Sequence, residues 1–205
     1  MSFDPRFTRR DALSLMAAAG AAAALPGAAL AQEGGLLQGA QVMGDPDAPV
    51  TIIEYVSLTC PHCARFHTHV FPEIKKDYIE TGKAKLEYRE VYFDRLGLWG
   101  GMVARCGGAD KYFAYIDHML RTQREWTRQE DVLDTFKKIG RVGGLSSEQV
   151  EACLNDQESA KALVEQYQEY RKDPRLTGTP TLIVGDEKIE NPTYENLAAA
   201  IDALL

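Results

Sequence analysis

Two cysteines three positions apart, at the junction of a strand pattern and a helix pattern, constrain the fold more than any other feature. Val50–Ser57 is a nearly continuous apolar run rich in β-branched residues, which predicts a central, buried strand. Cys60-Pro61-His62-Cys63 follows, and the stretch from Cys60 to about Thr81 predicts a helix that is broken near Pro72. The cysteine pair is therefore expected at the first turn of a helix that leaves a central strand.

The start of a helix favours thiolates. Its first backbone N–H groups are unpaired and its macrodipole is positive, so the pKa of a cysteine placed there falls. Pro61 suits an early helix position because its missing N–H is no loss there. His62 adds a donor and, when protonated, a second positive charge. The spacing of three residues places the two sulfurs within reach of a disulfide. Each of these effects stabilises the reduced form, which makes a Cys60–Cys63 disulfide a stronger oxidant.

Two other interpretations of the motif are a static disulfide and half of a zinc site. Zinc sites with four cysteines usually use two close pairs, whereas Cys106 and Cys153 stand alone. A c-type haem site needs His directly after the second Cys, and Ala64 is there instead. His67 and His69 could suggest a metal, but we expect them to be solvated helix histidines. The sequence predicts no metal and no organic cofactor.

Strand and helix signals follow one another in a simple order along the rest of the chain. Lys83–Tyr92 alternates apolar and charged residues and predicts a second strand. The pattern is then helical from about Gly97 to Tyr170. A strand at Thr181–Val184, a hairpin partner at Glu187–Ile189 and an amphipathic helix at Tyr194–Leu205 end the chain. The order predicts an α/β layer sandwich with an inserted helical subdomain.

Residues 1–31 have the features of an export signal. Arg9-Arg10 precedes an uncharged stretch, Leu13–Ala31, which is mostly Ala and Leu and ends in a small-x-small pattern suited to cleavage after Ala31. The paired arginines favour the twin-arginine route to the periplasm. An uncleaved membrane anchor is the alternative, although its Ala, Gly and Pro content is weakly lipophilic. Residues 32–49 are Gly-rich and polar, and we expect a mobile N-terminal lead-in with a turn.

The predicted export of the chain favours disulfides between its cysteines. All four lie after residue 31, and disulfides persist in an oxidising compartment, so the even number agrees with two bridges. The net charge of −7 argues against a general nucleic-acid binder, which would carry a basic field. The hydrophobic fraction of 45% is ordinary for a globular chain with a sizeable core.

Two motifs together resemble a known family. Thr59-Cys60-Pro61-His62-Cys63 follows an apolar strand, and Gly178-Thr179-Pro180-Thr181 precedes a late strand. This combination, with a helical insertion between the two halves, resembles the DsbA family of thiol–disulfide oxidoreductases in the thioredoxin superfamily. The resemblance implies a thioredoxin fold over residues 50–205, with the insertion at about 97–172.

The family's roles carry over to the matching positions. The resemblance implies that Cys60 is the exposed nucleophile that forms mixed disulfides and that Cys63 is the buried resolving thiol. It implies a cis peptide bond at Pro180, which faces the active site, with Thr179 contacting the substrate backbone. From the residues alone, Pro180 would be an ordinary trans proline at the start of a strand, because cis bonds are uncommon.

Glu54 lies six residues before Cys60, where relatives of this family carry a buried acid. A carboxylate inside a strand of Ile, Tyr and Val is costly unless it has a task. We expect a buried residue that relays a proton from Cys63 during exchange. The alternative is an edge-facing glutamate in water.

Cys106 and Cys153 depart from the simplest pattern of the family. Some relatives carry a second, non-catalytic disulfide in the insertion, and the resemblance implies a structural Cys106–Cys153 bond here. Closing such a loop stabilises by roughly 4 kcal/mol in the chain-entropy model. A regulatory pair that tunes the Cys60 site is the alternative.

The resemblance implies a periplasmic dithiol oxidase that donates its disulfide to unfolded exported proteins and is reoxidised by a DsbB-like membrane quinone reductase. A disulfide isomerase or reductase on the same fold is the closest alternative, but residues 32–49 are too few for the dimerisation domain that isomerases usually carry. We therefore expect a monomer. A non-enzymatic envelope chaperone or metal-binding module is the alternative from another class.

Overall fold

The computed structural model describes residues 36–205, and the predicted signal peptide at 1–31 lies outside them. A mixed sheet of five strands forms the centre, in the order β1 (Gln41–Met43), β3 (Ala84–Glu90), β2 (Val50–Val56), β4 (Thr181–Val184) and β5 (Glu187–Ile189). Strands β2 and β3 run parallel, and the other neighbours pair antiparallel. The predicted central strand is confirmed, because β2 lies between β3 and β4.

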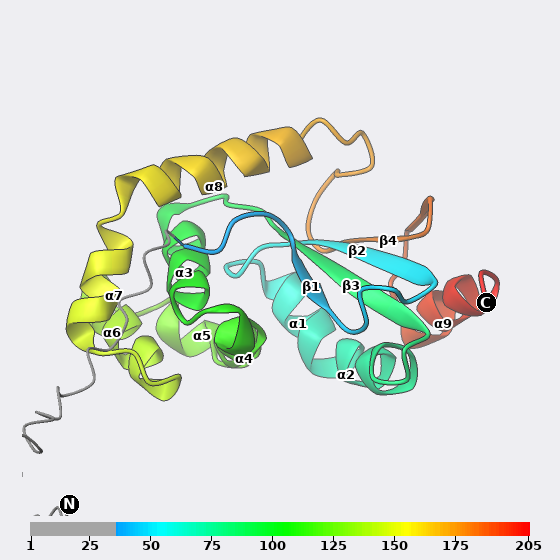
Figure 1. Ribbon diagram of the computed structural model, residues 1–205, viewed down its shortest axis with the longest axis horizontal. Helices are drawn as coiled ribbons and strands as arrows, with labels where there is room; N and C mark the ends of the chain where they lie inside the picture. The colour runs from blue at the N-terminus through cyan, green and yellow to red at the C-terminus, as the bar shows by residue number, and fades with distance from the viewer. Residues whose placement is uncertain (1–35) are drawn as a thin grey trace, which may run out of the picture. The chain divides into compact units, whose positions relative to one another are not determined.

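The two faces of the sheet are covered by different helices (Figure 1). Below the sheet lie α1 (Pro61–His69), α2 (Phe71–Ile74), the π-helix η2 (Lys75–Ile79) and, beside them, α9 (Tyr194–Asp202). The end of α8 (Gln157–Tyr170) covers the other face, where Tyr170 packs edge-on against Tyr55 of β2. Because side chains alternate along a strand, Ile52, Glu54 and Val56 face opposite to Tyr55. Glu54 is thereby directed to the main core.

The helical block between β3 and β4 is an insertion, as the sequence predicted. It comprises α3 (Arg95–Cys106), α4 (Ala109–Arg121), α5 (Gln123–Trp126), α6 (Val132–Val142), α7 (Ser147–Leu154) and α8. Helix α7 starts with a capping box between Ser146 and Gln149. Cys106 at the end of α3 and Cys153 in α7 form a disulfide with their Cα atoms 6.2 Å apart. The bond joins two helices within the insertion.

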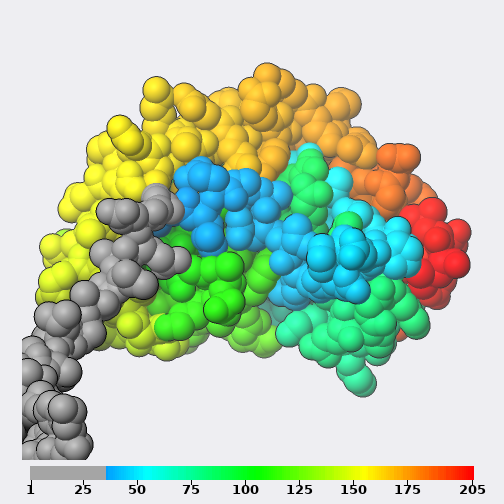
Figure 2. Space-filling view, viewed as in Figure 1, coloured from blue at the N-terminus to red at the C-terminus, as the bar shows by residue number. Residues whose placement is uncertain are grey.

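The segment predicted as a mobile lead-in is part of the fold from residue 36 onward, which corrects that prediction. Strand β1 pairs with β3, and the Arg105 guanidinium donates to the carbonyl oxygens of Leu37 and Gly39. Arg105 is itself buried in an ion pair with Glu90 of β3. Figure 2 shows the blue segment lying between the yellow-to-orange α8 and the green part of the insertion, which holds α3 and α4. The segment is thus held by a buried cation that belongs to α3.

Smaller boundaries also differ from the sequence pattern. The helix expected from Cys60 to about Thr81 is three pieces, because α1 ends at His69 and Pro72 occupies the first turn of α2. The last helix ends at Asp202 rather than Leu205. Among the helices of residues 36–205, none is long and apolar enough to cross a bilayer.

Candidate active site

The cysteine motif lies where β2 passes into α1. Cys60 is the N-cap residue of α1 with extended backbone, and Pro61 occupies the first helical turn. Cys60 is half-buried and Cys63, one turn further along, is fully buried. Both are free thiols in this structure. The site is therefore a dithiol with one accessible and one inaccessible sulfur.

The surroundings of Cys60 favour its thiolate. The pKa of Cys60 is lowered from 9.0 to about 5, chiefly because the Cys63 thiol hydrogen-bonds to it, against the opposing effect of partial burial. The Thr179 side chain and the backbone N–H groups of Cys63 and His62 contribute as well. The N–H groups belong to the first turn of α1, as expected for an anion at a helix start. Cys60 has the acidity of a nucleophile that is ionised at neutral pH.

Cys63 has the opposite character. Burial raises the pKa of the Cys63 thiol well above 9.0, and the neighbouring Cys60 and the Glu54 carboxylate raise it further. The backbone N–H of Ser57, on the loop after β2, donates to Cys63 Sγ at 3.5 Å. The two thiols of one helical turn therefore ionise in well-separated ranges of pH.

The second motif meets the first across the fold. The Thr179–Pro180 peptide bond is cis, the geometry that the resemblance implies, and it directly precedes β4. Cys60 Sγ lies 3.2 Å from the Thr179 carbonyl oxygen. The structure thus brings together Cys60, Cys63, Thr179 and Pro180, which are far apart in sequence.

A cavity of about 410 Å³ opens beside this junction. It lies between α1 and the loops that flank β4 and β5, and its wall is mixed apolar and polar: His62, Arg65, Phe66, His69, Val70, Thr179, Pro180, Asn191 and Pro192. A polypeptide lying against Thr179 would enter it.

Glu54 is buried, and its partner is a histidine that the sequence analysis placed in water. Glu54 has no exposed surface, and its Oε1 and Oε2 lie 3.0 and 3.1 Å from His67 Nε2. The His67 ring packs against Phe71 at 4.6 Å and edge-on against Tyr88 at 5.9 Å between centroids. The expectation that His67 is solvated is therefore wrong, whereas His69 is exposed as expected.

The spacing of residues along α1 could have predicted that His67 is buried. It lies four residues after Cys63, so both side chains share the face of α1 that packs on the sheet. Glu54 occupies the facing position of β2. Cys63, Glu54 and His67 form one buried polar group beneath the accessible thiol.

Gln123 is a site residue that sequence reasoning missed. Its buried side-chain amide on α5 donates to the carbonyl oxygens of Leu58 at 2.7 Å and of Cys60 at 3.0 Å. These bonds tie the helical insertion to the loop that carries the motif. No local pattern marks Gln123, because its partners lie more than sixty residues away in the chain.

A second tie joins the motif to the insertion. Thr59 Oγ1 donates to Asp94 Oδ2 at 2.7 Å, and Asp94 Oδ1 accepts from the Gly97 N–H at 2.8 Å as the N-cap of α3. One carboxylate thus starts the insertion and holds the residue before Cys60. The motif is fixed from two helices of the insertion.

Three features define the class of this protein: the mixed sheet with this strand order, the cysteine pair at the start of α1, and the cis-proline beside Cys60. Together they are those of a thioredoxin-fold protein with a dithiol site of the DsbA type. Comparison with known proteins agrees with this class. The family model described as Thioredoxin matches residues 37–203.

Individual relatives point the same way. A Rickettsia bellii protein named as a protein-disulfide oxidoreductase is 33% identical over 162 residues, which cover 78% of this chain and 62% of that protein. Disulfide bond formation protein D of Bacillus subtilis is 26% identical over 175 residues, 81% of this chain and 77% of that one. The crystal structure of Wolbachia pipientis alpha-DsbA1 superposes with a TM-score of 0.74 at 27% identity, covering 83% of this chain and 92% of that chain. The chain belongs to the DsbA-like family of the thioredoxin superfamily.

The acidity of Cys60 gives a direct prediction. Since its pKa is lowered to about 5, the rate of alkylation of the reduced protein by iodoacetamide should stay level from pH 8 to 6 and fall to half near pH 5. Mass spectrometry of the products should place the label on Cys60, because Cys63 is buried with a raised pKa. A half-point near pH 8 or 9, or a label shared equally by both cysteines, would contradict this description.

Proposed function

We propose that this protein is a periplasmic dithiol oxidase, which donates the Cys60–Cys63 disulfide to unfolded exported proteins. The observation that carries the proposal is the lowered pKa of Cys60, to about 5. A stabilised thiolate favours the reduced enzyme, so the disulfide is a strong electron acceptor. The export signal predicted from residues 1–31 supports the location.

The exchange takes two steps. A client thiolate attacks Cys60 Sγ, the Cys60–Cys63 bond breaks, and Cys63 leaves as a thiolate. A second client thiolate then attacks the client sulfur of the mixed disulfide, and Cys60 leaves as a stable thiolate. The client loses two electrons and the cysteine pair gains them. A membrane quinone reductase resembling DsbB then reoxidises the pair, and no metal or organic cofactor takes part on this chain.

The first step creates a charge in the core. Cys63 leaves as a buried thiolate whose pKa is well above 9.0, so it must take up a proton at once. Glu54 is the buried acid whose charge acts on Cys63, and His67 holds both of its oxygens. In this proposal Glu54 takes up a proton from solvent and passes it to the Cys63 thiolate, which returns Glu54 to the carboxylate. His67 is a positioning residue that keeps the carboxylate in place.

The transfer of the disulfide tests the proposed function. The oxidised protein should form the disulfide of a reduced, unfolded client that has two cysteines. The reaction is quenched with acid, the remaining thiols are alkylated, and the gel shift of the client measures how many were oxidised. Cys60→Ser should abolish the transfer because the attacked sulfur is gone. If the wild type and Cys60→Ser protected the client from aggregation equally and neither oxidised its thiols, the protein would act as a chaperone instead.

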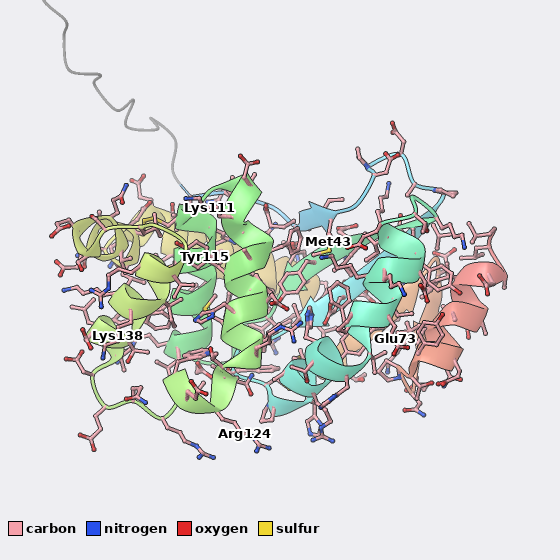
Figure 3. The ribbon with its side chains drawn as sticks, turned by 90° about the horizontal axis from the view of Figure 1, so that it is seen from below. Met43, Glu73, Lys111, Tyr115, Arg124 and Lys138 are labelled. Atoms are coloured by element: carbon pink, nitrogen blue, oxygen red, sulfur yellow. A yellow bond between two sulfur atoms is a disulfide. The ribbon has the colours of Figure 1, made fainter. Side chains whose placement is uncertain are left out.

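The relay makes a separate prediction. Glu54→Gln keeps the shape and a hydrogen bond to His67 but has no ionisable group. Reduction of the oxidised variant by excess dithiothreitol at pH 7 should slow by about tenfold or more, measured by quenched-flow alkylation. Glu73→Gln, which removes an exposed carboxylate from α2 (Figure 3), is the matched control and should react at the wild-type rate. Equal rates in all three proteins would rule out the relay.

A further inference from the structure

A second cavity borders the cysteine motif on the side away from Thr179. It has a volume of about 440 Å³ and lies between α1 and the α4–α5 turn of the insertion. Pro61 and Ala64, which flank the cysteine pair, form part of its wall. No step of the proposed mechanism uses this cavity, which we call the insertion groove.

The insertion groove is basic, although the chain as a whole carries a net charge of −7. Arg65, Arg121 and Arg124 line it together with His69, against a single lining carboxylate from Glu125. The exposed Arg65 and Arg124 form no ion pair with a carboxylate of residues 36–205. Arg121 pairs with Asp117 at 2.8 Å on the same helix. Figure 3 shows Arg124 projecting outward from the insertion.

The charges lie on elements that also hold the cysteine motif. Gln123, the residue before Arg124, donates to the Cys60 carbonyl oxygen at 3.0 Å, so the turn that carries Arg124 is anchored to the motif itself. Arg65 lies two residues after Cys63 on the rigid helix α1. Arg65 and His69 line both cavities and so form the ridge between them.

We propose that the insertion groove binds acidic residues that flank the reacting cysteine of a client polypeptide. This inference rests on the proposed function and names its substrate class: clients whose cysteine is accompanied by Asp or Glu within a few residues. Guanidinium groups without a local partner are suited to carboxylates, which they bind through paired N–H donors. A cationic groove on an otherwise acidic surface also attracts such segments preferentially.

Synthetic dithiol peptides test the inference. Three peptides share one sequence and differ only beside the cysteines, where they carry Glu, Gln or Lys. Each rate constant with the oxidised protein is divided by the rate constant of the same peptide with hydroxyethyl disulfide, an uncharged oxidant, which removes differences in the reactivity of the peptide thiols. The acidic peptide should react at least about fivefold faster than the neutral one, and the ratio should shrink as salt is added.

Two double variants separate the groove from overall charge. Arg65→Gln with Arg124→Gln should bring the ratio of acidic to neutral rates close to one. Lys76→Gln with Arg141→Gln removes the same charge from exposed positions that line neither cavity, and should keep the wild-type ratio. A wild-type ratio near one, or equal losses in both double variants, would overturn the inference while leaving the oxidase intact. If the wild type oxidised none of the peptides, the proposed function would fail and the inference with it.

Discussion

The unequal surroundings of two sulfurs one helical turn apart are the constraint on which the rest of the structure depends. Cys60 has the first N–H groups of α1 and the Cys63 thiol as donors, and its pKa is about 5. Cys63 lies in the core, where burial raises its pKa well above 9.0. Residues remote in sequence hold this loop: Cys60 Sγ lies against the Thr179 carbonyl oxygen, and Gln123 ties the Cys60 carbonyl oxygen to the insertion.

The site includes a buried carboxylate, which lowers the stability of the core unless a partner compensates it. A carboxylate in the main core loses its hydration, which costs several kcal/mol unless a partner compensates. The strand alternation that buries Ile52 and Val56 also buries Glu54, and His67 on the facing helix provides both contacts. A second buried pair, Glu90 of β3 with Arg105, lies on the same face of the sheet as Glu54 and holds the segment before β1. The fold thus places its buried charges where they join elements that are remote in sequence.

Local patterns explain what the sequence predicted correctly, and tertiary contacts explain what it missed. The apolar run of β2, the alternation of β3 and the helical insertion are properties of neighbouring residues, and the structure has all three. Strand β1 spans only Gln41–Met43 and exists because β3 offers a partner, so no periodicity could reveal it. The burial of His67 was missed because it follows only from two patterns taken together: the spacing of four residues from Cys63 on α1, and the position of Glu54 on the strand that faces it. Gln123 and Asp94 act through bonds to the motif over 63 and 35 positions of sequence, where no local signal reaches.

The equilibrium reduction potential of the Cys60–Cys63 pair, measured in glutathione redox buffers at pH 7, tests the central claim most directly. If the stabilised Cys60 thiolate makes the disulfide a strong oxidant, the potential should be about −120 mV, as in DsbA. A potential of about −270 mV, as in thioredoxin, would contradict this assignment. The protein would then be a reductase built on the same fold.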